Sequence, residues 1–210
     1  FDTSGGKTIT IPNTIGSSYT VDWGDGTTTT EGGSGNFTNI SHTYASGIAT
    51  SIVSIGAAGD TGPFTMFKFN GGGSKSDLLD VPQWGDIVFH DLLEMFKGCN
   101  NVNFQISATD APTFANTTSL QYLSHAFNNA TYFNSDINHW DVSKLSAQAR
   151  DVFAGATNFN QNLSSWVIKA PYSPYFFNGT SISADNYTDT IVGWAVTVYK
   201  NSGTYNINFS

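Results

Sequence analysis

The stretch VFAGATNFNQNLSSW, residues 152–166, decides the fold that this sequence predicts, because its pattern occurs more than once in the chain. Phe159 lies 26 residues after Phe133, and Trp166 lies 26 residues after Trp140. Near-regular repetition at this interval is typical of stacked repeats, in which each unit buries its apolar face only against its neighbours. Residues 63–210 are therefore predicted to form a solenoid.

A phenylalanine marks the same place in four of these units. The four residues are Phe96, Phe127, Phe153 and Phe177. The intervals between them are 31, 26 and 24 residues. We therefore expect the four rings to be buried in equivalent environments.

A short helical pattern precedes the phenylalanine in each unit. Leu120, Leu123 and Phe127 follow one another at steps of three and four residues, and residues 149–153 show a similar pattern. Such spacing places apolar side chains on one face of a helix. Each unit is thus predicted to be one turn of helix followed by an extended segment, giving an α/β solenoid similar to a leucine-rich repeat.

These units resemble the BspA-type leucine-rich repeat, also known as a Mycoplasma-lipoprotein-type repeat of surface proteins, with the pattern MFxGAxxFNQDLSxWDVS. Residues 152–166 are a close copy of most of that pattern, and residues 140–143 supply its WDVS end. The resemblance covers about residues 63–200. The first and last units depart most from the pattern, as capping repeats do.

The first part of the chain, residues 7–55, has a β pattern. Its runs are short, rich in β-branched residues and separated by Gly, Asn and Pro. This pattern is typical of an antiparallel sandwich. No helical periodicity competes with it.

Within this part, residues 21–27 (VDWGDGT) suggest either a calcium loop or a tight turn. An EF-hand loop counted from Asp22 would need oxygen ligands where Gly24, Gly26 and Gly33 stand. Asp25 followed by glycine instead predicts a hairpin turn, because glycine tolerates positive φ. We expect both aspartates to accept hydrogen bonds from turn amides, with metal binding as the alternative.

Residues 19–27, followed by Ser-His-Thr-Tyr at 41–44, resemble a PKD domain. The resemblance covers about residues 1–62 and implies an Ig-like β-sandwich of an extracellular protein. It gives His42 a packing role beside the hairpin. The predicted domains are therefore a PKD-like sandwich at 1–62 and the repeat region at 63–210.

Composition narrows the class of protein. Charged residues are 11% of the 210, aromatic residues are 14%, and neutral polar residues fill most of the remainder, which favours an extracellular or cell-surface location. The net charge of −8 argues against nucleic acid and anionic membrane as partners. No apolar run approaches a membrane span. The single cysteine excludes an intrachain disulfide.

Catalytic chemistry leaves little trace. Cys99 could be imagined as a nucleophile with a histidine as its base. The candidate bases are His90, His125 and His139. However, Cys99 stands where Ala130 and Ala156 stand in sister units, which favours a packed side chain. We predict no enzyme activity, no cofactor and no catalytic or metal site.

Two further motifs suggest contact with sugars. His139, Trp140 and Asp141 could stack on and bind a pyranose, but a tryptophan that recurs at a fixed repeat position favours the core. Eight N-x-S/T sequons make N-glycans possible. They begin at Asn36, Asn39, Asn116, Asn129, Asn162, Asn178, Asn186 and Asn208.

Two functions remain open. The first is a surface protein that adheres to, or binds, a protein or glycan through the repeat region, as the two resemblances imply. The second is a structural subunit of a fibre, appendage or virion that assembles head-to-tail with copies of itself. The alternating segment 205–210 is expected to be a paired strand.

Overall fold

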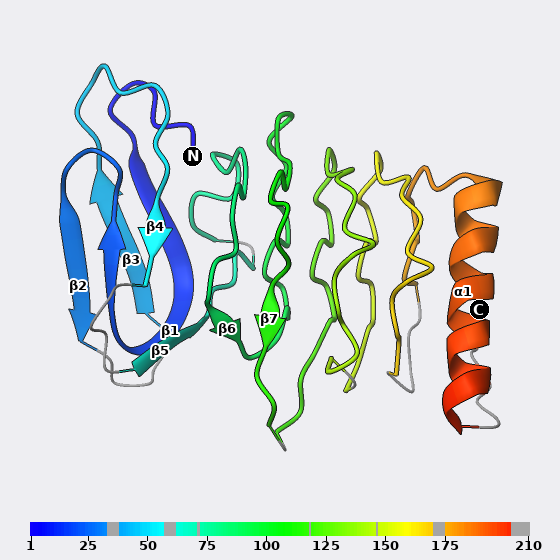
Figure 1. Cartoon of the computed structure of the whole chain (residues 1–210). Coiled ribbons are helices and arrows are strands. Elements are labelled where there is room, and N and C mark those ends of the chain that lie inside the picture. Colours follow the sequence, from blue (N-terminus) through cyan, green and yellow to red (C-terminus); the bar gives the residue numbers. More distant parts are fainter. Residues whose placement is uncertain are drawn as a thin grey trace.

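The computed structural model describes residues 1–32, 38–56, 62–70, 72–117, 119–145, 147–169 and 175–202. Seven strands and one helix lie within these residues. They are β1 (Thr8–Asp22), β2 (Thr28–Gly32), β3 (Thr38–Thr43), β4 (Ser54–Ile55), β5 (Gly62–Met66), β6 (Val88–Phe89), β7 (Thr113–Phe114) and α1 (Ala184–Ser202). Figure 1 shows a sheet at one end of the molecule, α1 at the other, and a stack of irregular segments between them. The predicted strand at 205–210 lies outside the described residues.

Strand β1 is the centre of the N-terminal sheet. Its first half pairs antiparallel with β3, and its second half pairs antiparallel with β2, β4 and β5. The register against β3 shifts between Ile11 and Thr14, beside Pro12, which has no N–H to donate to a ladder. The runs 8–12 and 18–22, which the sequence predicts as two strands, are therefore one strand with an irregularity at its middle.

The segments between the sheet and α1 are built from main-chain hydrogen bonds of two alternating kinds. Every second N–H between residues 92 and 98 donates to a carbonyl of residues 122–128, at 2.8–3.1 Å. Of the N–H groups between them, those of Met95 and Lys97 donate three residues back within their own segment, at 3.1 and 3.3 Å, and that of Leu93 donates to the Asp91 carboxylate at 3.0 Å. Residues 123–130 repeat this alternation against residues 148–154. Successive units are thus joined side by side by their main chains.

This alternation sets the backbone conformation at two positions of each unit. The residues two before and two after the marker phenylalanine have positive φ, between 51° and 76°. They are Glu94, His125, Asp151 and Tyr175 before it, and Gly98, Asn129, Gly155 and Gly179 after it. Asn, Asp and His are the non-glycine residues that tolerate this region best, and they hold three of the five non-glycine sites.

Aromatic rings form rows through the centre of the stack. The ring of Phe127 lies 5.3 Å from that of Phe96 and 5.2 Å from that of Phe153, and Phe177 follows at 6.0 Å. A parallel row joins Phe133 to Phe159 at 6.1 Å. Phe96, Phe127 and Phe153 are fully buried, as the repeat pattern predicts. Phe177 is partly buried and packs against the same core.

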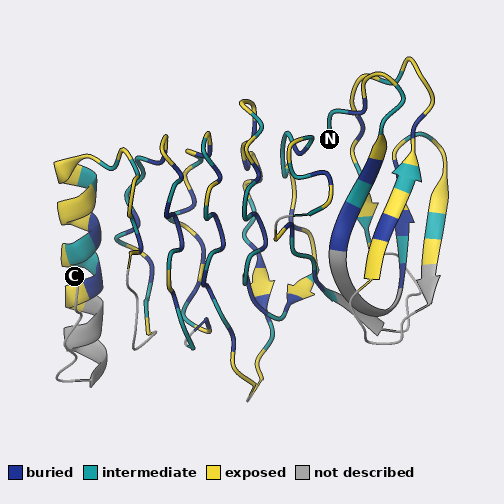
Figure 2. Ribbon diagram, turned by 180° about the vertical axis from the view of Figure 1, so that it is seen from behind, coloured by how far each residue is buried: buried dark blue, intermediate teal, exposed yellow. Residues whose placement is uncertain are grey.

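Helix α1 covers the last unit of the stack. It begins after Ser183, whose hydroxyl accepts a hydrogen bond from the N–H of Asn186 at 3.2 Å, as an N-cap does. The indole N–H of Trp194 donates to the carbonyl of Leu163 at 2.8 Å, and the N–H of Leu163 donates to the hydroxyl of Thr190 at 2.9 Å. Figure 2 shows the buried residues of α1 on the side that faces the stack.

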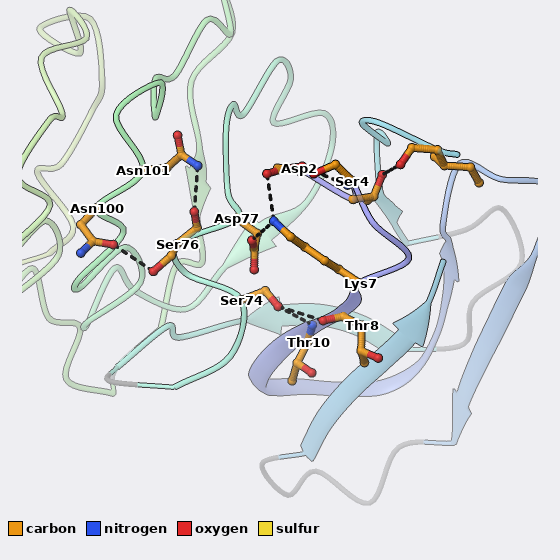
Figure 3. A network of polar contacts seen from close by, with 12 residues as sticks. Asp2, Ser4, Lys7, Thr8, Thr10, Ser74, Ser76, Asp77, Asn100 and Asn101 are labelled. Carbon is orange, nitrogen blue, oxygen red and sulfur yellow. Dashed lines mark hydrogen bonds and ion pairs between the residues drawn. The ribbon is translucent and has the colours of Figure 1, made fainter. Parts of the chain in front are cut away.

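A polar network joins the sheet to the first unit (Figure 3). The ammonium of Lys7 lies 2.9 Å from a carboxylate oxygen of Asp2 and 2.8 Å from one of Asp77. The N–H of Thr10 donates to the Ser74 hydroxyl at 3.0 Å, and the N–H of Ser74 donates to the carbonyl of Thr10 at 2.9 Å. One cluster of buried residues runs from the sheet to α1. The domain boundary at residues 62 and 63 stays a prediction.

The predicted fold class, an Ig-like sandwich followed by an α/β leucine-rich-repeat-like solenoid, is wrong. The described residues form small β-sheets and a single helix, α1, with no helix in the units around Phe127 and Phe153. Leu120, expected on the apolar face of a helical turn, is 65% exposed. The reason is the pattern of hydrogen bonds, because an α-helix would send each N–H four residues back within its own segment. The first five strands form one sheet around β1.

Candidate binding surfaces

One side of the stack carries ionisable side chains at the repeated position two residues before the marker phenylalanine. We call Glu94, His125, Asp151 and Tyr175 the ionisable column. The N–H of Glu94 donates to the carbonyl of Ser124, and that of His125 donates to the carbonyl of Arg150. These bonds hold successive units in register. The column is therefore a continuous strip across the units.

Charged neighbours pair with members of the ionisable column. Lys97 lies 2.8 Å from Glu94, and the Arg150 guanidinium lies 2.9 Å from Asp151. His125 Nδ1 lies 3.7 Å from the same Asp151 carboxylate. Burial, together with the Lys97 cation, lowers the pKa of His125 below its usual value, so this ring is neutral at pH 7. These partly exposed pairs add little stability, which leaves them available for contact with a partner.

The cysteine and the tryptophans of the repeats lie in the core. Cys99 is fully buried, as Ala130 and Ala156 are, and burial raises the pKa of its thiol. The predicted packing role is confirmed. Trp140 and Trp166 are buried and their rings lie parallel at 6.5 Å. The interpretation of Trp140 as a core residue is confirmed, and the alternative of a sugar-stacking platform is wrong.

The hairpin at residues 22–27 is held by its aspartates. Asp22 accepts a hydrogen bond from the N–H of Gly24 at 2.9 Å, and Asp25 accepts one from the N–H of Thr27 at 3.1 Å. The predicted turn-capping role is confirmed for both. Within the described residues, no three His, Cys, Asp or Glu side chains come together as a metal site.

His42 links the hairpin to β3. Its ring stacks on Trp23 with centroids 5.1 Å apart, which confirms the packing role, and its Nε2 lies 2.7 Å from Asp25. The Tyr44 hydroxyl donates to the carbonyl of Trp23 at 2.7 Å. The sequence did not predict the contact between His42 and Asp25, because the two residues are 17 positions apart. The available signal was that Asp25 lies in the stretch 19–27 and His42 in the stretch 41–44, and that these two stretches together resemble a PKD domain.

The stability of the hairpin is expected to depend on acid pH through Asp25. Hydrogen bonds from Thr27 and then from His42 lower the pKa of this carboxyl to about 2, while an unfolded aspartate titrates near about 3.9. A lowered folded pKa contributes stability that is complete above about pH 4 and is lost as the pH falls from about 4 to about 2. Urea unfolding across this range should show a shallower loss for Asp25→Asn than for the parent.

The control for this experiment is Asp86→Asn, which removes an exposed carboxylate. It should keep the acid dependence of the parent chain. An Asp25→Asn variant that lost stability between pH 4 and pH 2 as steeply as the parent would contradict the assignment.

A cleft lies between the N-terminal sheet and the first unit of the stack. Its volume is about 530 Å³. We call it the apolar cleft, and its walls come from three parts of the chain. They are residues 52–55 around β4, Phe67 with Phe69, and residues 78, 80–85, 87 and 89. Phe1, Ile11 and Phe96 complete the lining. The sequence did not predict this cleft, since it exists only where the sheet and the repeats meet.

Most of the described sequons are accessible. Asn39, Asn116, Asn129 and Asn178 are exposed. Asn162 and Asn186 are partly buried, and the sequons at residues 36 and 208 lie outside the described residues. Glycosylation stays a prediction. No helix in the described part of the chain is long and apolar enough to cross a bilayer.

Comparison with known proteins finds one family. No curated protein and no solved structure matches this chain. A family model described as "Mycoplasma protein of unknown function, DUF285" matches residues 65–196, which include every repeat unit and most of α1. The match covers more than half of the chain. The chain therefore belongs to the DUF285 family.

Proposed function

We propose that this chain is a non-enzymatic extracellular surface protein that binds a protein or glycan through its repeat region. The observation that carries the proposal is the ionisable column. In a chain with only 11% charged residues, it brings Glu94, His125 and Asp151 into one strip, with Lys97 and Arg150 beside them. Electrostatic complementarity to such a strip would give a partner its register and orientation.

Two further features support the proposal. The only thiol, Cys99, is buried and its pKa is raised, so it does not offer a nucleophile. The resemblances to PKD domains and to BspA-type repeats point to extracellular proteins that make contacts. An extracellular setting also suits the neutral polar composition.

The alternative is a structural subunit that assembles head-to-tail. One observation favours it, because Val192 and Val196 lie one turn apart on α1 and are 54% and 48% exposed. The sheet and α1 cover the two ends of the stack (Figure 1), which argues against head-to-tail assembly. At the α1 end, the N–H of Leu163 already donates to the hydroxyl of Thr190. Binding is therefore the function that the geometry supports better.

The test measures binding and assembly on the same preparation. The chain is applied to immobilised glycans and to immobilised surface proteins, while light scattering and negative-stain imaging report its assembly state. The double variant Lys97→Glu with Arg150→Glu should weaken binding by about fivefold, since exposed charge contacts contribute up to about 1 kcal/mol each. The matched control, Lys169→Glu, reverses an exposed charge outside the ionisable column and should bind as the parent does.

Filaments without binding would favour the structural alternative. Binding that the double variant does not weaken more than the control would move the contact away from the ionisable column. Turnover of a substrate would overturn the proposal.

A further inference from the structure

We propose that the apolar cleft binds a small uncharged apolar molecule. This site lies at the junction between the sheet and the repeats. No residue of the ionisable column lines it, and it does not depend on the function proposed above. Its volume of about 530 Å³ falls within the range of about 300–1,000 Å³ that ligand sites occupy. Such sites are lined mainly by apolar and aromatic side chains with few polar groups, and this lining has the same character.

The walls of the cleft are aromatic on the side of the stack. Trp84 meets Phe89 edge-on with centroids 5.5 Å apart, and Phe67 meets Phe89 in the same way at 6.2 Å. These perpendicular contacts fix the rings against each other. The cleft therefore has walls that are formed before any ligand enters, which reduces the entropy that binding costs.

The opposite wall comes from the loop that leads into β4. Ile52 lines the cleft and is 69% exposed, while Val53 and Ile55 beside it are partly buried. An aliphatic side chain as exposed as Ile52 gains from contact with an apolar ligand, because the contact removes its surface from water. The loop thus offers apolar surface that the fold itself leaves uncovered.

Charge decides which apolar molecules fit. Asp80 is the one ionisable side chain among the described residues that line the cleft, and its carboxylate already accepts hydrogen bonds from the N–H and hydroxyl of Ser107, at 2.9 and 2.6 Å. Phe1 also lines the cleft, and its α-ammonium already donates to the carbonyl of Ser51 at 2.9 Å. An anion would meet Asp80 and a chain of net charge −8. Burying any unpaired charge among these rings is costly, so the occupant is uncharged.

The experiment compares two probes with the same rings. N-phenyl-1-naphthylamine is uncharged at pH 7, and 1-anilinonaphthalene-8-sulfonate adds one negative charge to the same skeleton. Both fluoresce more strongly in apolar surroundings. The uncharged probe should bind the folded chain at least about tenfold more tightly than the sulfonated one, because a buried unpaired charge costs more than about 1.4 kcal/mol. Asp80→Asn should reduce the difference in affinity between the two probes.

Two matched variants locate the bound probe. Ile52→Ser should weaken binding of the uncharged probe about fivefold, because the ligand loses contact with one aliphatic side chain. Val102→Ser is the control, since Val102 is 67% exposed and does not line the cleft. Circular dichroism and thermal melting should show that both variants keep the parent fold.

Three outcomes would overturn the proposal. They are equal affinity for the two probes, equal effects of Ile52→Ser and Val102→Ser, and no binding of the uncharged probe at millimolar protein. Weakening by Ile52→Ser together with discrimination between the probes would support it. Because the ionisable column takes no part in these readouts, the result is independent of whether a protein or glycan partner is found.

Discussion

Phe153→Ala is expected to lower the free energy of unfolding by about 3–5 kcal/mol, the usual cost of removing a buried phenylalanine side chain. The ring is fully buried, and it lies 3.9 Å from the ring of Phe159 and 5.2 Å from that of Phe127. Its loss would leave a cavity in the middle of two aromatic rows. Urea unfolding should show the decrease, and the melting temperature should fall by roughly 10 °C.

The control for this prediction is Tyr132→Ala. This aromatic side chain belongs to a neighbouring turn but is 41% exposed, so its loss should change stability by only about 0.5 kcal/mol. If the two variants lost similar stability, the aromatic rows would not be the centre of the folded chain. A drop confined to Phe153→Ala would confirm that they are.

Gly24→Ala is expected to destabilise the chain by about 2–4 kcal/mol, through backbone strain and a steric clash together. Gly24 has a φ of 75°, where a side chain is strained, and a Cβ built there would clash with the carbonyl oxygen of Ile52. The backbone of that loop would have to move. Because Ile52 lines the apolar cleft, the variant should also weaken binding of the uncharged probe.

Gly26→Ala separates the two causes. Gly26 belongs to the same hairpin and has a φ of 89°, but a Cβ there would meet no atom within 4 Å. Gly26→Ala should lower the free energy of unfolding by only about 1 kcal/mol, the cost of the strained backbone conformation alone. Comparing the two variants by urea unfolding therefore isolates the clash with Ile52. Equal losses in both variants would show that the loop moves freely out of the way.

Several features of the fold could be predicted from local pattern alone. The spacing of Phe96, Phe127 and Phe153 predicted burial, because rings that recur at one position of a repeat face the same interior. Asp25 followed by glycine predicted a capped turn, because carboxylates accept hydrogen bonds from nearby amides. In both cases the physical cause acts within a unit or a turn.

The helical turn expected before each phenylalanine could not be excluded from the sequence. Leu123 and Phe127 are four residues apart, a spacing that also occurs when a chain turns by alternating hydrogen bonds. Whether the segment forms a helical turn or bonds to the next unit depends on the acceptors of that unit, such as the carbonyl of Val152, which accepts from the N–H of Phe127. A pattern of side chains contains no information about those acceptors.

The sequence by itself determined that the phenylalanines of the central repeats leave water, because burial of Phe96, Phe127 and Phe153 follows residue type and repeat position. Only the tertiary structure decided which carbonyls accept from the main-chain amides, how β1 pairs with four other strands, and where the apolar cleft lies. These features depend on groups far apart in the chain. A main-chain hydrogen bond has the same chemistry at nearly every residue, so its partner is chosen by packing and not by the local sequence.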